Sequence, residues 1–382
     1  AHHFFGYYEK SPWDADDRLI LCGEMDFNDR MPTADDVLRL GVIDTADGDR
    51  LEIVDETRAW CFQQGCMLQW LPPDYRDWII FNDREGDRFV SRLRNLRTGQ
   101  TKTIDRTIYQ LDPQGRYALS VNVARLNETR PGYGYEGVAD PWTDAPHPAD
   151  DGVYRIDLAT GASTLLVSLD AAAQLKPVDS MKGAKHWFNH VQISRDGSRF
   201  AVLHRWNGPD IRGHLTRLLI GNPMTGEVRL RFDHDFFSHY DWLGADTFVG
   251  YARVPADLAE RDDDRQFLIL PADSDDVRVL GRGIFTADGH NSFSPDRRWM
   301  LNDMSYRQDG KQTLMLYRMP DDAHPAGERI DVAEFNSEWI ADRPLRCDLH
   351  PRWNRAGDRL CVDSLHDGTR QMYEIDVRDI IT

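Results

Sequence analysis

The sequence predicts an all-β fold, a seven-bladed β-propeller made of four-stranded antiparallel blades. Three observations predict it. A turn motif followed by a short apolar strand recurs seven times in the 382 residues. A second motif, a strand, a polar turn and another strand, follows most of the copies. The periodicity of an amphipathic helix is nearly absent, with residues 170–176 and 256–262 as the clearest helix-like stretches.

The first motif places an apolar or aromatic residue before a tight turn that is rich in Ser, Pro, Asp and Gly. Its copies begin at Ser11 (SPWDADDRLILC), Trp70 (WLPPDYRDWIIF), Leu111 (LDPQGRYALSV), Ile193 (ISRDGSRFAVLH), Asp241 (DWLGADTFVGY), Phe293 (FSPDRRWMLND) and Trp353 (WNRAGDRLCVD). Such turns are common in all-β proteins, and a pair of sandwiches could supply three or four copies. Seven copies along the whole chain favour the propeller.

The second motif supplies the outer half of each blade. It reads as a hairpin, with Asp-Gly or Thr-Gly between two β-rich runs, for example in VYRIDLATGASTLLV from Val153. We therefore expect one propeller domain over residues 1–382. Residues 125–151 do not belong to the repeat and are rich in Gly, Pro and aromatic residues. We expect them to form an insertion loop, and long loops of this kind are often functional. The last unit ends after its third strand, which leaves the closure of the ring open.

Histidines collect in the strands that precede the seven turns. These strands are the innermost ones of the blades and line the central channel. Eight of the thirteen histidines fall in them: His2, His3, His186, His190, His234, His239, His290 and His350. Polar inner-strand residues can simply pack against one another. A convergence of His, Tyr, Gln and Arg on one cavity is also typical of sites of proton transfer.

A first cluster, on the sixth and seventh blades, contains candidate metal ligands. His290, Cys347 and His350 are the predicted ligands, with Asp348 beside them. Strand alternation places residues 348 and 350 on one face and Cys347 on the other unless a bulge intervenes. Nitrogen and sulfur ligands suit Zn²⁺, whereas His and carboxylate without sulfur suit Mn²⁺. We expect a divalent metal, zinc rather than manganese, and no organic cofactor. The alternative is a buried Cys and a His bonded to Asp348.

A second cluster, on the fourth and fifth blades, contains candidate catalytic residues. These are His190, His204, Tyr240 and Arg253, which we expect to face one another across the junction of the two blades. Two bases, a phenol and a guanidinium are what β-elimination of a uronic acid requires. A cation neutralises the carboxylate and stabilises the enolate-like charge. A His or Tyr removes the C5 proton, and a Tyr or His protonates the leaving oxygen.

At these residues the sequence resembles the seven-bladed polysaccharide lyases, oligogalacturonate lyase and the ulvan lyases. The similar segments are NHVQISRDGSRFAVLHRW from Asn189, GHNSFSPD from Gly289 and DLHPRWNRAGDRLCVDSLHDG from Asp348. The resemblance implies lytic cleavage at uronic acids. Oligogalacturonate lyase holds Mn²⁺ on three histidines and a glutamine, of which His290 and His350 match two while Asp348 replaces the third. The ulvan-lyase pattern of two His, a Tyr and an Arg is met by His190, His204, Tyr240 and Arg253, with a structural zinc nearby, and is the preferred mapping.

Further residues are predicted to bind the sugar. They are His239 and, on the insertion loop, Arg130, Tyr133, Tyr135 and Trp142, because aromatic rings stack on pyranose faces. The loop could instead only cap a blade. An acidic oligo- or polysaccharide is thus the expected partner. A glycoside hydrolase would need two carboxylates flanking the bond, and a non-catalytic propeller that binds a protein remains the other alternative.

Composition excludes several other functions. The net charge of −18 argues against a nucleic-acid partner, and no apolar run is long enough for a membrane span. Five cysteines are an odd and sparse set for this length, so a reducing, cytoplasmic compartment is mildly favoured over secretion.

Overall fold

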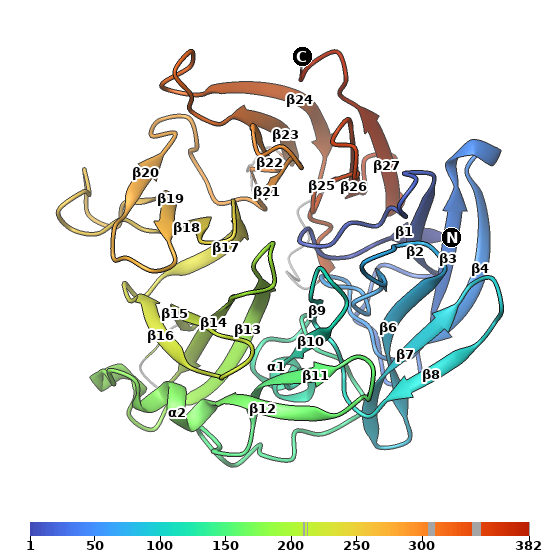
Figure 1. Ribbon diagram of the computed structural model, residues 1–382, viewed down its shortest axis with the longest axis horizontal. Helices are drawn as coiled ribbons and strands as arrows, with labels where there is room; N and C mark the ends of the chain where they lie inside the picture. Colours follow the sequence, from blue (N-terminus) through green and yellow to red (C-terminus); the bar gives the residue numbers. More distant parts are fainter. Residues whose placement is uncertain (209–210, 212, 305–309, 338–344, 382) are drawn as a thin grey trace.

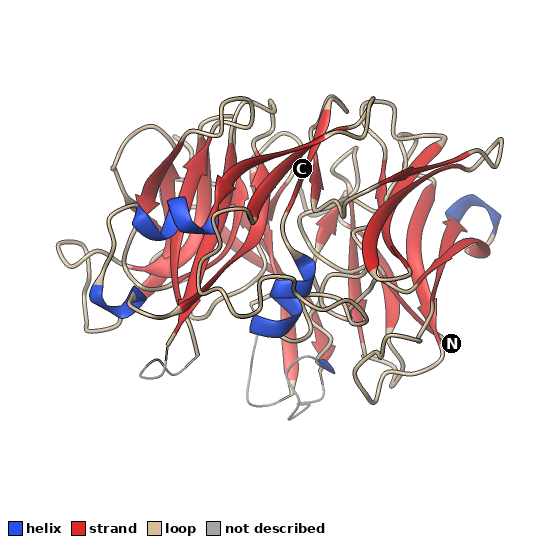
Figure 2. Cartoon of the chain, turned by 90° about the horizontal axis from the view of Figure 1, so that it is seen from below, coloured by secondary structure: helices blue, strands red, loops and turns tan. Residues whose placement is uncertain are grey.

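The structure is a computed structural model, and it describes all residues except 209–210, 212, 305–309, 338–344 and 382. Seven antiparallel sheets stand around a common axis, as Figure 1 shows. The predicted seven-bladed propeller is therefore confirmed. Seen from the edge in Figure 2, the strands run between two faces of the ring, and loops and short helices lie at its rims.

The strands follow the chain from the axis outward in every blade. The first three blades consist of β1 (His2–Phe4), β2 (Leu19–Met25), β3 (Leu38–Asp44) and β4 (Arg50–Thr57); β5 (Gln69–Trp70), β6 (Trp78–Glu85), β7 (Arg88–Asn95) and β8 (Thr101–Ile104); and β9 (Gln110–Leu111), β10 (Tyr117–Ser120), β11 (Gly152–Asp157) and β12 (Ser163–Ser168). The next two consist of β13 (Lys185–Ile193), β14 (Phe200–Asn207), β15 (Leu215–Gly221) and β16 (Val228–Phe232); and β17 (Phe237–Trp242), β18 (Thr247–Arg253), β19 (Arg265–Pro271) and β20 (Arg278–Leu280).

The sixth blade has β21 (Ser292–Phe293), β22 (Trp299–Asn302), β23 (Lys311–Arg318) and β24 (Glu328–Asn336). The seventh has three strands within the described residues, β25 (Arg352–Trp353), β26 (Arg359–Ser364) and β27 (Gln371–Asp376). The innermost strands β1, β5, β9, β13, β17, β21 and β25 are the segments expected to line the channel. The turn motifs connect them to the second strand of each blade, as the repeat predicts.

Helices are short and lie outside the repeat. They are α1 (Val123–Thr129) at the start of the insertion, α2 (Leu169–Gln174), η1 (Thr45–Asp47) and η2 (Asp179–Met181). The helix expected over 170–176 is α2, whereas the stretch 256–262 forms turns. No helix of the described chain combines the length and apolar character needed to cross a bilayer.

Apolar side chains fill the space between neighbouring blades. One cluster joins blades 1 and 2, another extends over blades 2 to 4, and three more join blades 4 and 5, 5 and 6, and 6 and 7. The contact between blade 7 and blade 1 is different, because its apolar cluster has only Trp13, Ile20 and Cys361 as buried members among the described residues.

Polar contacts close the ring at that junction. Arg352 forms a buried ion pair with Asp363 at 2.6 Å and donates to the carbonyl of Gly6 at 2.7 Å. Asp363 in turn accepts hydrogen bonds from the backbone N–H groups of Phe5 and Gly6, both at 3.2 Å. The segment after β1 is therefore held to blade 7 by a charged pair rather than by an exchanged strand.

Candidate active site

Four histidines from four consecutive blades form an arc inside the channel. His190, His239, His290 and His350 each lie three residues before the last inner-strand residue, which is Ile193, Trp242, Phe293 and Trp353 respectively. Their ring centroids follow one another at 6.0, 4.0 and 4.4 Å. All four are buried or nearly so. One position of the repeat thus builds the arc.

The backbone at this position departs from a regular strand. His190 and His350 have φ of 50° and 44°, in the left-handed region that non-glycine residues rarely occupy. The pairing of β13 with β14 shifts between Asn189 and Gln192, and the pairing of β17 with β18 shifts between Phe237 and Tyr240. A bulge re-aims the side chains of the strand that carries it, and strained backbone of this kind concentrates at functional sites.

The C-terminal half of the arc forms a group that could hold a metal ion. Donor atoms of His290, Asp348 and His350 lie within 4.8 Å of one another, and all three residues are buried. The Nδ1 atom of His290 lies 2.8 Å from a carboxylate oxygen of Asp303, which leaves Nε2 as the ligand atom. The Nε2 atoms of His290 and His350 are buried and have no hydrogen-bond partner among the described residues. A carboxylate behind a ligating imidazole is the usual second shell of a metal site, so these residues fit a divalent cation.

Cys347 is not a member of this group. Burial raises the pKa of its thiol to about 12, and its sulfur does not join the donor atoms of His290, Asp348 and His350. The expectation of zinc over manganese depended on this sulfur and is not supported, because the donors that come together are two imidazoles and a carboxylate.

Two guanidinium groups, one buried and one half-buried, lie beside the N-terminal half of the arc. Arg205, on β14, is 3% exposed; its Nε donates to the Thr216 hydroxyl at 3.3 Å, and it forms no ion pair with a carboxylate within the described chain. Burial and the neighbouring Arg130 lower its pKa to about 9. Arg130 belongs to the insertion, contacts Nε2 of His214 at 3.2 Å and lies over the ring of Tyr133. This end of the channel therefore holds positive charge in a protein whose net charge is −18.

The arc itself is largely neutral at its N-terminal end. Burial lowers the pKa of His190 well below its usual value, and Arg205 and His239 add to the effect. Burial also lowers the pKa of His239, although Asp288 lies 3.0 Å from its Nδ1 and opposes the shift. A hydrogen bond of 3.1 Å joins Nε2 of His190 and the Tyr7 hydroxyl. Neutral imidazoles can accept a proton at pH 7.

The predicted catalytic cluster is only partly assembled. His204 lies on the other face of β14 from Arg205, where its Nε2 contacts Nδ1 of His186 at 2.8 Å and its Nδ1 accepts from Arg217 at 3.1 Å. Its side chain is thus directed toward α2 and blade 3, not toward His190. Arg205, one residue further along, occupies the face that meets His190, because neighbouring strand residues point to opposite sides.

Tyr240 and Arg253 also lie away from the arc. The Tyr240 hydroxyl donates to the backbone carbonyls of His190 and Ala201, and its ring packs in the core between blades 4 and 5. His239, one residue earlier, enters the channel instead. Arg253, at the end of β18, pairs with Asp263 at 3.1 Å near the surface. The exchange of His239 for Tyr240 follows from the bulge in β17, which moves the channel position by one residue from the one expected.

The insertion contributes to the site through Arg130 and Tyr133. Tyr133 is buried, and its ring lies 6.2 Å from that of His190. Tyr135 is instead buried against blade 2, where its hydroxyl accepts from Asn82 at 3.0 Å. Trp142 is half-buried and anchors the loop, because its carbonyl accepts from the buried Arg125 at 3.0 Å. These contacts give Tyr135 and Trp142 roles within the insertion, and sugar contacts by their rings stay a prediction.

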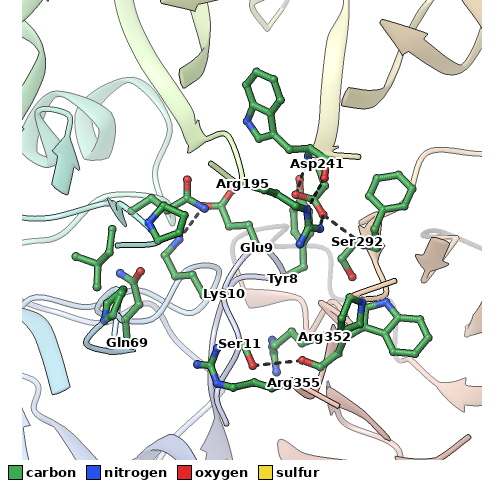
Figure 3. A pocket seen from close by; sticks show the side chains of 18 of the residues that line it. Tyr8, Glu9, Lys10, Ser11, Gln69, Arg195, Asp241, Ser292, Arg352 and Arg355 are labelled. Atoms are coloured by element: carbon green, nitrogen blue, oxygen red, sulfur yellow. Dashed lines mark hydrogen bonds and ion pairs between the residues drawn. The ribbon is translucent and has the colours of Figure 1, made fainter. Parts of the chain in front are cut away.

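The opposite mouth of the channel also contains a cavity, of about 420 Å³, which is seen in Figure 3. The segment that follows β1 lies along it, and the Tyr8 hydroxyl donates to the carbonyl of Tyr240 on the far side of the channel. The charges there are paired within the protein: Lys10 with Glu9 at 2.7 Å, and Arg195 with Asp241 at 3.2 Å. At the histidine end Arg205 and Arg130 form no ion pair with a carboxylate of the described chain, so this end is the better candidate for an anionic substrate.

A sequence signal for the arc exists in the pattern His-x-x-apolar before the turn. It occurs as HVQI, HYDW, HNSF and HPRW in blades 4 to 7. Alignment of the repeats on this pattern selects His239 in place of Tyr240. Arg205, Tyr7 and Asp303 carry no such signal, because they reach the site from other strands or from the N-terminal segment.

Comparison with solved structures supports the fold. An oligogalacturonate lyase in complex with manganese superposes with a TM-score of 0.67 at 15% identity, over 98% of this chain and 90% of the other. An oligogalacturonate lyase from Vibrio parahaemolyticus superposes with a TM-score of 0.65 at 12% identity, over 98% and 91%. Hydrazine synthase from Kuenenia stuttgartiensis follows at 0.55 and 9%, over 97% and 96%. No family model and no curated protein sequence matches the chain.

Proposed function

We propose that this protein is a lyase that cleaves an acidic oligo- or polysaccharide at a uronic acid by β-elimination. The observation that carries the proposal is the pair of guanidinium groups beside the histidine arc, the buried Arg205 and the half-buried Arg130. A buried cation such as Arg205 is costly without an anion, and Arg130 adds a second positive charge beside it, so the site favours a carboxylate ligand. A uronate supplies that carboxylate next to the carbon that must lose its proton.

The substrate carboxylate is the group that takes up negative charge during the reaction. The C5 proton is only weakly acidic, and its removal places negative charge on the carboxylate oxygens. Arg205 and Arg130 offer planar, multi-donor groups that pair with a carboxylate and stabilise this charge as it forms. His290, Asp348 and His350 would hold a divalent cation, which supplies further neutralisation of the carboxylate when it is bound.

Proton transfer falls to the imidazole and phenol groups around the same point. His190 and His239 are neutral by burial, and Tyr7 and Tyr133 bring hydroxyl groups to the same end of the channel. Groups of this kind remove the C5 proton and return a proton to the leaving O4, typically with a rate gain of about 10²–10⁴ for each well-placed group. Tyr240 has no part in this proposal, since its hydroxyl is bonded to backbone carbonyls.

Two further observations support a lyase over the alternatives. Both oligogalacturonate lyase structures superpose over nearly the whole chain, and one of them holds manganese. The channel carboxylates each face a cation or imidazole, with Asp288 at His239, Asp303 at His290 and Asp348 at Arg346. A glycoside hydrolase requires two carboxyl groups that are available to the substrate.

Ultraviolet absorbance tests the proposal, because β-elimination creates a conjugated double bond. The purified protein would be incubated with polygalacturonate, its oligomers and other uronate polymers, with Mn²⁺ and with a chelator. We expect absorbance to rise with at least one uronate, and Arg205→Gln to abolish the rise. Arg199→Gln, at an exposed ion pair on the same blade, is the matched control and should retain activity.

Two results would overturn the proposal. New reducing ends without a rise in absorbance would indicate hydrolysis. No product from any uronate, with or without metal, would leave a binding protein as the better explanation.

A further inference from the structure

Tyr133 is held at the histidine end of the channel by two cations. Its hydroxyl accepts a hydrogen bond from Nη2 of Arg346 at 2.9 Å, and the guanidinium of Arg130 lies 4.3 Å from the centre of its ring. The ring lies edge-on to His190, with centroids 6.2 Å apart. Leu126 and Trp187 pack against it and fix its orientation. Tyr133 is thus a rigid phenol at the position where the proposed substrate carboxylate would be bound.

Its charged surroundings favour the phenolate. Burial alone would raise the pKa of Tyr133, but Arg346 and Arg130 outweigh burial and lower the pKa to about 8, even with Asp348 opposing them. Arg205, His190 and Tyr7 face the same point from blade 4 and the N-terminal segment. Tyr133 differs in this from the other described tyrosines with a shifted pKa, because the pKa of each of those is raised.

We infer that Tyr133 is the catalytic base of the proposed elimination, an inference that rests on the proposed function. The phenolate oxygen takes the C5 proton, and the electrons of the C5–H bond form the C4–C5 double bond as the C4–O4 bond breaks. O4 leaves with the electron pair of that bond and takes the proton back from the Tyr133 hydroxyl. The phenolate is restored, and no oxidant, reductant or other reactant is consumed.

The position of Tyr133 on the insertion gives this inference its structural reason. Arg130 and Tyr133 come from the same short segment, and the segment is anchored by the buried pair of Arg125 with Asp140 at 2.9 Å. Carboxylate binding and proton removal are therefore placed by one rigid element. Tyr7, the nearest alternative phenol, has a pKa raised by burial and is bonded to His190, so it remains protonated.

Phenolate absorbance tests the ionisation without any substrate. The near-ultraviolet difference spectrum of the folded protein would be recorded from pH 6 to 10. We expect one tyrosine to titrate near pH 8, and Tyr133→Phe to remove that step. Tyr135→Phe, a buried tyrosine two residues away, should leave the step unchanged, while Arg346→Met should move it to higher pH. Absence of the step in the wild type would overturn the inference.

Kinetics tests the catalytic role. We expect kcat/KM of the wild type to rise with pH up to about 8, and Tyr133→Phe to lower kcat by ~10²–10⁴-fold with little change in KM. A Tyr133→Phe variant that keeps both kcat and the pH profile would overturn the assignment even if the phenolate is present. No turnover of any uronate by the wild type, with the titration intact, would overturn the proposed function and the catalytic step together, while the ionised state of Tyr133 would stand.

Discussion

The ion pair at the closure of the ring offers the most direct test of how this propeller is held together. Arg352 and Asp363 are almost completely buried, and Asp363 also accepts two backbone N–H groups of the N-terminal segment. Asp363→Asn keeps the shape of the side chain but removes its charge. The guanidinium of Arg352 then remains buried without a counter-ion.

The expected loss of stability follows from that burial. Breaking a buried ion pair by removing one partner costs about 3–5 kcal/mol. An unfolding entropy of ~2.1 cal/mol/K per residue gives about 0.8 kcal/mol/K for 382 residues. The variant should therefore unfold about 4–6 °C below the wild type in a calorimetric scan.

A matched exposed pair provides the control. Asp77 and Arg97 are 3.2 Å apart, with side chains that are 46% and 74% exposed. Because exposed ion pairs contribute little, Asp77→Asn should leave the unfolding temperature essentially unchanged. Equal unfolding temperatures for Asp363→Asn and the wild type would refute the reasoning that this pair closes the ring.

Three further predictions concern single residues. Asp303→Asn should weaken Mn²⁺ binding by ~10–100-fold in calorimetric titration, because Asp303 orients His290; an unchanged affinity would place the metal elsewhere. Tyr240→Phe should retain the lyase activity, since its hydroxyl only bonds backbone carbonyls, and a loss as large as that of Tyr133→Phe would contradict this. His204 has a pKa lowered by burial and by Arg217, so it stays neutral when folded but takes up a proton below pH ~6.5 when unfolded. The free energy of unfolding therefore falls as the pH drops below that value. In denaturant titrations, His204→Gln should make this fall shallower by up to ~1.4 kcal/mol per pH unit. An unchanged slope would argue against a neutral His204.

Much of the architecture could be predicted because the same turn motif recurs once in every blade. Each of the seven turns follows an inner strand and precedes an apolar one, so the number and order of the blades, and the segments along the channel, were determined by the sequence alone. The concentration of histidines in those segments likewise pointed to one end of the channel. His290 and His350 were found because they occur at the same place in adjacent units.

The tertiary structure decided which side of each strand faces the channel. Side chains alternate along a strand, so a bulge of one residue exchanges the channel face for the core face. This exchange places His239 in the channel and Tyr240 in the core. On β14 the alternation of side chains directs Arg205 rather than His204 toward His190. Cys347 lies outside the metal-competent group. Tyr7, Asp303 and Arg346 reach the site from distant parts of the chain, and only the closed ring brings them to it, because a channel is formed by all blades together.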